Sequence, residues 1–265
     1  MLSPRVPAEL QDHIVDLLHD ERDTLKSCCL VSKSWIPRTR KQLFSDIMFR
    51  TQEQVRSWQT LFPDPSISPA CFTRTLSVEY PQALKTTDAE EGDWIPTFSC
   101  VETFKVLINE MDIQEDDYKF LVPFHGFSPD IKSLAVNFFV FPPSHVFDLI
   151  LSFPLLEDLF ILNDDPDSIL GNNIFDRQPA EIQSSSPPVF PGCLELSLAC
   201  GMDYMASRLL SLPNGLRFRE LDLMWRVGYD VVLTEELVGM CSSTLESLSV
   251  KDLSERTSVP RSHLH

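Results

Sequence analysis

The chain has 265 residues, of which 43% are apolar, and it carries a formal net charge of −17. That apolar content is too high for a disordered chain, and so acidic a surface repels phosphate backbones, which argues against nucleic acid as a partner. The charge is uneven: residues 1–45 hold seven Lys/Arg and six Asp/Glu, whereas residues 46–265 hold 15 and 33.

The cysteines and the apolar runs indicate a cellular compartment. Seven cysteines are scattered without a CxxC pair, and the N-terminus turns polar within five residues. No apolar run approaches the ~18 residues that a membrane-spanning helix needs. We therefore expect buried thiols in a protein of the cytoplasm or nucleus, with no membrane partner.

Residues 1–45 predict three short helices. The first begins at Pro7 and has an apolar face formed by Leu10, Ile14, Leu17 and Leu18. Asp23 and Ser34 are expected to cap the second and third helices. A three-helix unit of this size cannot bury so many apolar side chains by itself. Another surface is therefore expected to cover them.

The ordered string of residues 5–45 resembles an F-box, in particular that of F-box proteins common in mushroom-forming fungi. It contains Val-Pro-x-Glu-Leu at 6–10 and Cys-Leu-Val-Ser-Lys-x-Trp at 29–35, with Val6 where Leu is usual. The resemblance implies that the unit docks on a Skp-type adaptor, and through it on a cullin–RING ubiquitin ligase. By the same resemblance the adaptor-binding residues are Val6, Pro7, Leu10, Ile14, Leu17, Leu18, Leu30, Val31 and Trp35. The alternative is that these residues pack only against residues 46–265.

The rest of the chain repeats one spacing, apolar-x-x-apolar-x-apolar. The middle apolar residues stand at 47, 76, 104, 134, 159, 196, 221 and 248, with steps of 29, 28, 30, 25, 37, 25 and 27 residues. A period of ~20–29 residues with this spacing is typical of leucine-rich repeats. We therefore predict an α/β fold, in which a three-helix unit (1–45) precedes a curved leucine-rich-repeat-like solenoid with a parallel sheet (46–253). A loop insert is expected at 176–192 and a flexible tail at 254–265.

The sequence contains none of the common nucleotide-binding, catalytic or metal-binding motifs. It contains no GxGxxG, GxxxxGK[ST], GxSxG or HExxH motif, and none of its six histidines pairs with a cysteine at zinc spacing. We therefore expect no enzyme, no cofactor and no metal. Two acidic clusters, 88–94 and 109–118, are expected either as solvated loops on the edge of the solenoid or as a rim that attracts a basic target. Trp225, Arg226 and Tyr229 follow a predicted strand and are candidate target-binding residues of the concave surface.

Together these patterns predict a protein that recruits a substrate to an SCF-type cullin–RING ubiquitin ligase. The helical unit would bind the adaptor, and the solenoid would hold an unknown target protein. The alternative function is a leucine-rich-repeat interaction scaffold with no link to a ubiquitin ligase. The two differ in whether the apolar side chains of the helical unit are exposed in the isolated chain.

Overall fold

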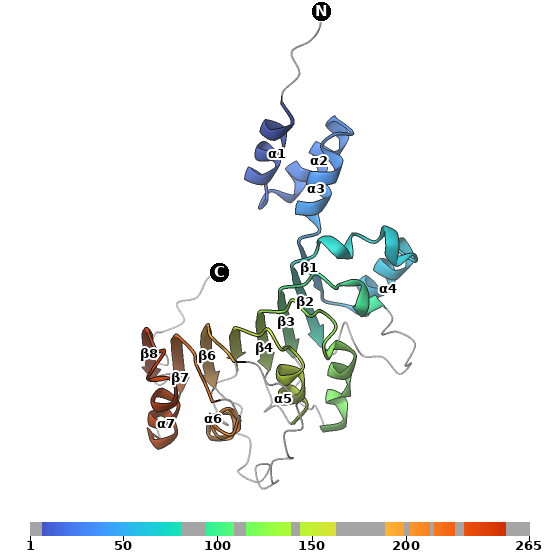
Figure 1. Ribbon diagram of the computed structural model, residues 1–265. Helices are drawn as coiled ribbons and strands as arrows, with labels where there is room; N and C mark the ends of the chain where they lie inside the picture. Colours follow the sequence, from blue (N-terminus) through green and yellow to red (C-terminus); the bar gives the residue numbers. More distant parts are fainter. Residues whose placement is uncertain are drawn as a thin grey trace, which may run out of the picture.

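The computed structural model describes residues 7–80, 94–108, 115–138, 144–162, 189–198, 202–212, 215–225 and 231–252. A helical N-terminal unit leads into one open, eight-stranded parallel sheet, so the protein is α/β (Figure 1). Some of the predictions fall outside the described residues, namely those for Val6, Arg226, Tyr229, residues 176–188 of the insert, and the tail 254–265. None of the described helices is long and apolar enough to cross a membrane.

Three helices form the N-terminal unit: α1 (Ala8–Leu17), α2 (Arg22–Val31) and α3 (Ile36–Leu43). They occupy the predicted positions, but the predicted caps are wrong. Asp23 lies in the first turn of α2, where its carboxylate accepts a hydrogen bond from Lys26 Nζ at 2.8 Å. Ser34 precedes α3 by two residues, and its hydroxyl donates to Gln11 Oε1 at 3.2 Å. Both side chains find these partners in place of the backbone N–H groups of a helix start.

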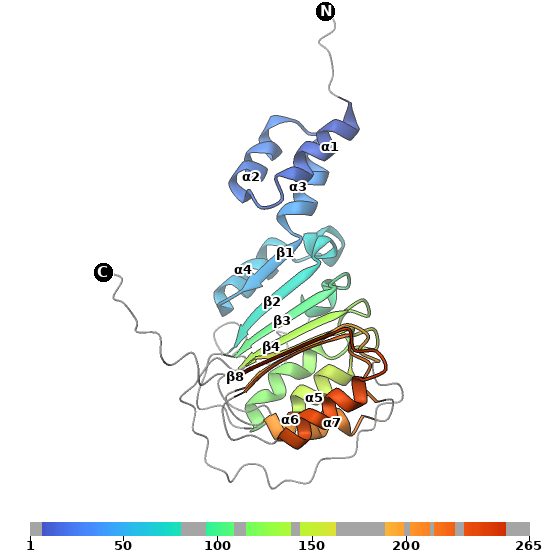
Figure 2. The same ribbon diagram turned by 90° about the vertical axis from the view of Figure 1, so that its left-hand side faces the viewer.

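The interior of this unit is small, and Arg22 bonds its second helix to the junction with the sheet. Its buried side chains are Val15, Leu25, Cys28 and Thr39. Arg22 Nη2 donates to the carbonyl oxygens of Leu43 at 3.3 Å and of Asp46 at 2.7 Å. The start of α2 is thereby bonded to the junction between α3 and the first strand. Figure 2 shows the unit beyond the first strand, next to the edge of the sheet that this strand forms.

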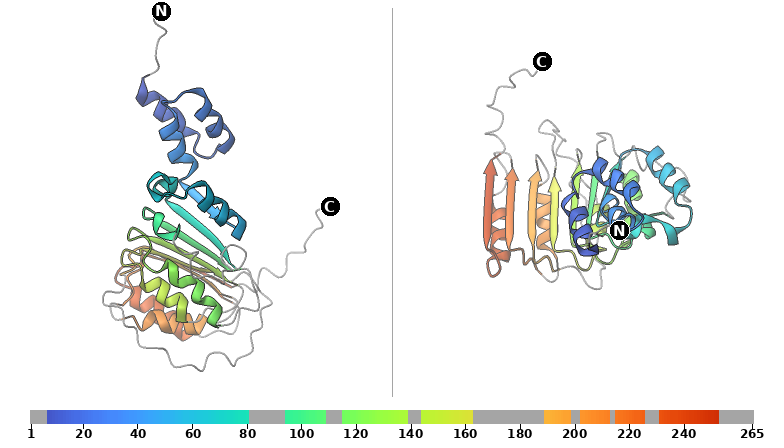
Figure 3. Two further views of the ribbon diagram at one scale, coloured as in Figure 1. Left: turned by 90° about the vertical axis from the view of Figure 1, so that its right-hand side faces the viewer. Right: turned by 90° about the horizontal axis from the view of Figure 1, so that it is seen from above.

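The sheet consists of eight parallel strands in sequence order. They are β1 (Asp46–Phe49), β2 (Thr75–Tyr80), β3 (Thr103–Ile108), β4 (Ser133–Phe138), β5 (Asp158–Leu162), β6 (Cys193–Leu198), β7 (Glu220–Trp225) and β8 (Ser247–Asp252). Between them lie α4 (Gln52–Leu61), η1 (Pro65–Ile67), η2 (Pro69–Phe72), η4 (Glu115–Phe124), α5 (Ser144–Leu151), α6 (Met202–Leu210) and α7 (Val231–Cys241). The sheet is curved, α5–α7 lie on one side of it, and no described helix covers the opposite face (Figures 1 and 3).

Strand pairing aligns one inward-facing residue per strand: Ile47, Leu76, Phe104, Leu134, Leu159, Leu194, Leu221 and Leu248. The steps are therefore 29, 28, 30, 25, 35, 27 and 27 residues. Seven of the eight predicted positions are confirmed. For β6 the sequence predicted Leu196 at the aligned position, whereas the structure has Leu194 there. Because side chains alternate with a period of two, Leu194 and Leu196 share one face, and the spacing alone does not choose between them.

A recurring backbone turn precedes the strands. The carbonyl oxygen of Ser45 accepts from the N–H groups of Arg74 at 2.8 Å and of Thr75 at 2.9 Å, and later units repeat this pair of bonds. Between β5 and β6 the pattern changes, since the N–H of Cys193 donates to the side chain of Asp158, with 2.8 Å to Oδ1. This hydrogen bond accompanies the pairing of Leu159 with Leu194, the β5–β6 register that the spacing of the apolar residues did not determine.

The core lies between the sheet and its helices and is rich in phenylalanine. The ring of Phe104 stacks on that of Phe124, with centroids 5.0 Å apart. The inward-facing residues of β1–β7 that the structure describes are at most 8% exposed, whereas Leu248 and Val250 in β8 are 47% and 50% exposed. Each strand is therefore covered by the next unit, and β8 has no such cover among the described residues.

Candidate functional site

The most exposed apolar side chains of the helical unit lie on two of its helices. Leu30 and Val31, at the end of α2, are 88% and 70% exposed. On α1, Leu10, Ile14 and Leu17 are exposed as well. We call these five side chains the apolar surface. Leaving them in water is unfavourable, because full burial of such a side chain stabilises by ~1.5–3 kcal/mol.

The geometry of α1 explains why part of its apolar face points outward. Leu10, Ile14 and Leu17 are spaced by four and three residues and so share one stripe of the helix. Val15, on the neighbouring stripe, is buried, and Leu18 is half-buried. The helix therefore packs through Val15 and presents the other stripe to solvent. The single apolar face that the sequence predicted is divided in two.

A hydrogen-bonded turn brings the end of α2 beside the first turn of α1. The half-buried indole of Trp35 donates from Nε1 to Gln11 Oε1 at 2.9 Å, and the Ser34 hydroxyl donates to the same oxygen. Leu30 and Val31 end the helix that leads into this turn, and Leu10 is the chain neighbour of Gln11. These bonds join the turn that follows α2 to the first turn of α1.

A charged pair holds α1 against α3. The carboxylate of Asp16 accepts from Arg38 Nε at 2.6 Å, from Arg38 Nη2, and from Gln42 Nε2 at 2.7 Å. The hydrogen bonds from Arg38, followed by that from Gln42, hold the pKa of Asp16 at about 2, although partial burial acts in the opposite direction. This pair fixes the orientation of α1 and thus of its exposed stripe.

The predicted adaptor-binding residues divide into three groups. Leu10, Ile14, Leu17, Leu30 and Val31 belong to the apolar surface, and Pro7 is exposed just before α1. Leu18 and Trp35 are half-buried, so they support the unit more than they extend its surface. Val6 lies outside the described residues. Helix α3 packs against η2, and the described part of residues 46–252 does not cover the apolar surface.

The predicted target-binding residues are placed only in part. Trp225 is the last residue of β7, and Arg226 and Tyr229 follow outside the described residues. The bare face of the sheet carries four carboxylates that were not predicted as a site, Asp158, Glu195, Glu220 and Asp222, and we call them the acidic face. Along β5–β7 these carboxylates alternate with buried leucines, so they point to the opposite face of the sheet. This alternation is the sequence signal from which they could have been predicted.

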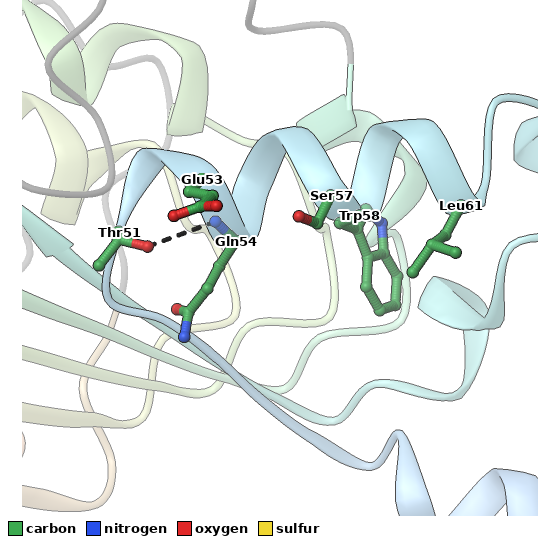
Figure 4. A pocket seen from close by; sticks show the side chains of 6 residues that line it. All are labelled: Thr51, Glu53, Gln54, Ser57, Trp58 and Leu61. Carbon is green, nitrogen blue, oxygen red and sulfur yellow. Dashed lines mark hydrogen bonds between the residues drawn. The ribbon is translucent and has the colours of Figure 1, made fainter.

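A shallow hollow of about 420 Å³ follows α4 and is lined by Thr51, Glu53, Gln54, Ser57, Trp58 and Leu61 (Figure 4). Its side chains come from one helix and its capping residue, whose hydroxyl accepts from the N–H of Gln54 at 3.3 Å. They include one carboxylate, that of Glu53, and the hydroxyl groups of Thr51 and Ser57. Within the described ranges, no group of His, Cys, Asp and Glu side chains has the geometry of a metal site.

Comparison of the chain with protein-family models, with curated proteins and with solved structures finds no match in any of the three. The likeness to F-box proteins therefore rests on the residues quoted from the sequence.

Proposed function

We propose that this protein recruits a substrate to an SCF-type cullin–RING ubiquitin ligase in the cytoplasm or nucleus. The helical unit is the F-box and docks on a Skp-type adaptor through the apolar surface. The eight-stranded sheet is a leucine-rich-repeat solenoid, and it holds the target protein.

The exposure of the apolar surface is the observation that carries this proposal. Leu30 is 88% exposed at a position where the resemblance expects an adaptor contact. A partner that buried Leu17, Leu30 and Val31 would gain ~1.5–3 kcal/mol from each, before the cost of association. Val15, on the neighbouring stripe of α1, is 1% exposed, so this helix is packed on one side and its exposed apolar stripe is not the result of loose packing.

The proposed mechanism is proximity. By holding the target and the adaptor at once, the chain raises the effective concentration of a target lysine near a ubiquitin-charged enzyme. No catalytic residue is needed in the chain for this role.

A co-purification experiment tests the proposal. The full chain is co-expressed with a tagged Skp-type adaptor as wild type and as the Leu17→Lys, Leu30→Lys double variant. Both positions are exposed in the last turn of a helix, where a cation is favoured, so the unit should still fold. The matched control is Leu61→Lys, at the end of α4 and 68% exposed.

We expect the adaptor to retain the wild type and the control, and to lose the double variant. Equal recovery of all three would mean that the contact lies elsewhere on the chain. No recovery of the wild type would remove the adaptor role and leave a leucine-rich-repeat interaction scaffold.

A further inference from the structure

The acidic face lies where three successive strands present alternate residues away from the helices. Asp158 begins β5, Glu195 lies in β6, and Glu220 and Asp222 lie in β7. The register pairs Cys193 with Glu220 and Glu195 with Asp222. Carboxylates of adjacent strands are therefore cross-strand neighbours, an arrangement that is unfavourable unless a cation shares it.

The Cys193 thiol lies on the same face and is surrounded by these carboxylates. Its pKa is raised to about 11, first by burial and then by the charges of Glu220, Asp158, Glu195 and Asp222. Burial and the charge of Asp222 likewise raise the pKa of Glu195, and Lys251 opposes them. Lys251 lies 3.0 Å from Asp222 and compensates one end of the cluster. The centre, around Cys193, keeps an excess of negative charge.

A hollow of about 520 Å³ opens beside Cys193. It is lined by Glu157, Asp158, Pro191, Gly192, Cys193, Arg219, Glu220 and Glu246. The position of Gly192 holds Ser45 in the first unit and a charged side chain in the other described units, which pair as Arg74–Glu102 at 2.7 Å, Lys132–Glu157 at 3.8 Å and Arg219–Glu246 at 4.0 Å. The glycine interrupts this series, and the Asp158 carboxylate approaches closely at its position, where a Cβ would stand 2.1 Å from Asp158 Oδ1. The hollow therefore opens beside an Asp158 carboxylate whose Oδ1 already accepts from the N–H of Cys193.

Apolar side chains lie next to the carboxylates on the same face. Phe160 of β5 pairs in register with Glu195, and Leu162 pairs with Ser197. Both Phe160 and Leu162 are half-buried, as is Met224 of β7. A ligand that crossed β5–β7 would therefore meet carboxylates and an apolar strip together. This combination matches a peptide segment better than a small inorganic cation.

We propose that the acidic face and its hollow bind an extended protein segment that carries two or more Lys or Arg side chains and at least one apolar side chain. One cationic side chain enters the hollow beside Gly192, another meets Glu195 and Asp222, and the apolar side chain packs on Phe160. The role of this segment as the recruited target rests on the proposed function, whereas its binding does not.

The test is fluorescence anisotropy with the full chain and a labelled nine-residue peptide that carries three arginines and one leucine. The arginines of a second peptide are replaced by neutral citrulline. The protein variant Glu195→Gln, Asp222→Asn keeps the side-chain shapes of the face. The matched control Glu235→Gln, Glu236→Gln removes the same charge from exposed positions of α7.

We expect the arginine peptide to bind, the citrulline peptide to bind at least tenfold more weakly, and the face variant to lose about tenfold in affinity. The α7 control should stay within about twofold. The bound peptide should also slow alkylation of Cys193, measured by mass spectrometry, and leave that of the exposed Cys71 unchanged.

Three results would overturn the proposal. The first is absence of binding, and the second is an equal loss in the face variant and in the α7 control, which would indicate attraction to net charge alone. The third is displacement of the peptide by spermine at the peptide's own concentration, which would indicate a site for cations without recognition of a chain. Because the face variant leaves the apolar surface intact, its co-purification with the Skp-type adaptor tests the proposed function separately.

Discussion

Replacement of Asp16 by Asn is expected to loosen α1 in a manner that depends on pH. The hydrogen bonds from Arg38 and Gln42 lower the pKa of Asp16 from 3.8 to about 2. A shift of this size corresponds to about 2 kcal/mol. The side chains of Asp16 and Arg38 are each 35% exposed, so solvent screening reduces the contribution to about 1 kcal/mol.

The direction of the pH dependence follows from the lowered pKa. A carboxyl group whose folded pKa lies below its unfolded pKa stabilises the fold above the unfolded value, near pH 4, and loses this contribution as the pH falls through about 2. The wild type should therefore hold α1 more firmly than D16N at pH 6. The two proteins should converge towards pH 2.

Amide hydrogen exchange of residues 8–17, corrected for intrinsic rates, measures this locally. We expect D16N to exchange about fivefold faster than the wild type at pH 6. The matched control is Asp12→Asn on the same helix, because Asp12 adds only the last of the charge contributions to Arg38. Equal protection of D16N and wild type at pH 6, or a difference that persists at pH 2, would refute the reasoning.

Three further substitutions probe the sheet by urea denaturation. Gly192→Ala should lower the free energy of unfolding by about 1–2 kcal/mol, because the new Cβ would stand 2.1 Å from Asp158 Oδ1. The Asp158 carboxylate would have to move and would lose its hydrogen bond from the N–H of Cys193. In an Asp158→Ala background most of this cost should vanish. Phe104→Ala should cost about 3–5 kcal/mol, since the ring is fully buried. Leu248→Ala, at the matching position of the uncovered β8, should cost less than about 1.5 kcal/mol; costs of equal size would contradict the described burial.

The three helices of residues 1–45 and the positions of seven strands could be predicted because each has a strong periodic signal. The strand period places Phe104 and Leu134 inward without any knowledge of their partners, and the structure pairs them in register. In β6 the same signal is ambiguous, because Leu194 and Leu196 lie on one face. The bond between Cys193 and Asp158 joins residues 35 positions apart, and no local pattern contains it.

The candidate site could be predicted in outline and not in detail. The surplus of apolar residues in the helical unit predicted a partner surface, but it did not separate exposed Leu17 from half-buried Leu18, since that depends on how α1 packs against α3. The two acidic clusters were visible as runs of sequence, and residues 88–93 and 109–114 of them lie outside the described residues. The acidic face is spread over β5–β7, so it becomes visible only when the strands are aligned.

Calorimetric titration of the full chain with a purified Skp-type adaptor tests the central proposal most directly. We expect one-to-one binding with a negative heat-capacity change, which is the signature of apolar burial. Leu30→Lys should weaken it by at least about thirtyfold, the equivalent of about 2 kcal/mol for one buried leucine. An absence of binding heat over a range of temperatures, or an affinity that Leu30→Lys leaves unchanged, would contradict the assignment of the apolar surface as an adaptor-docking site.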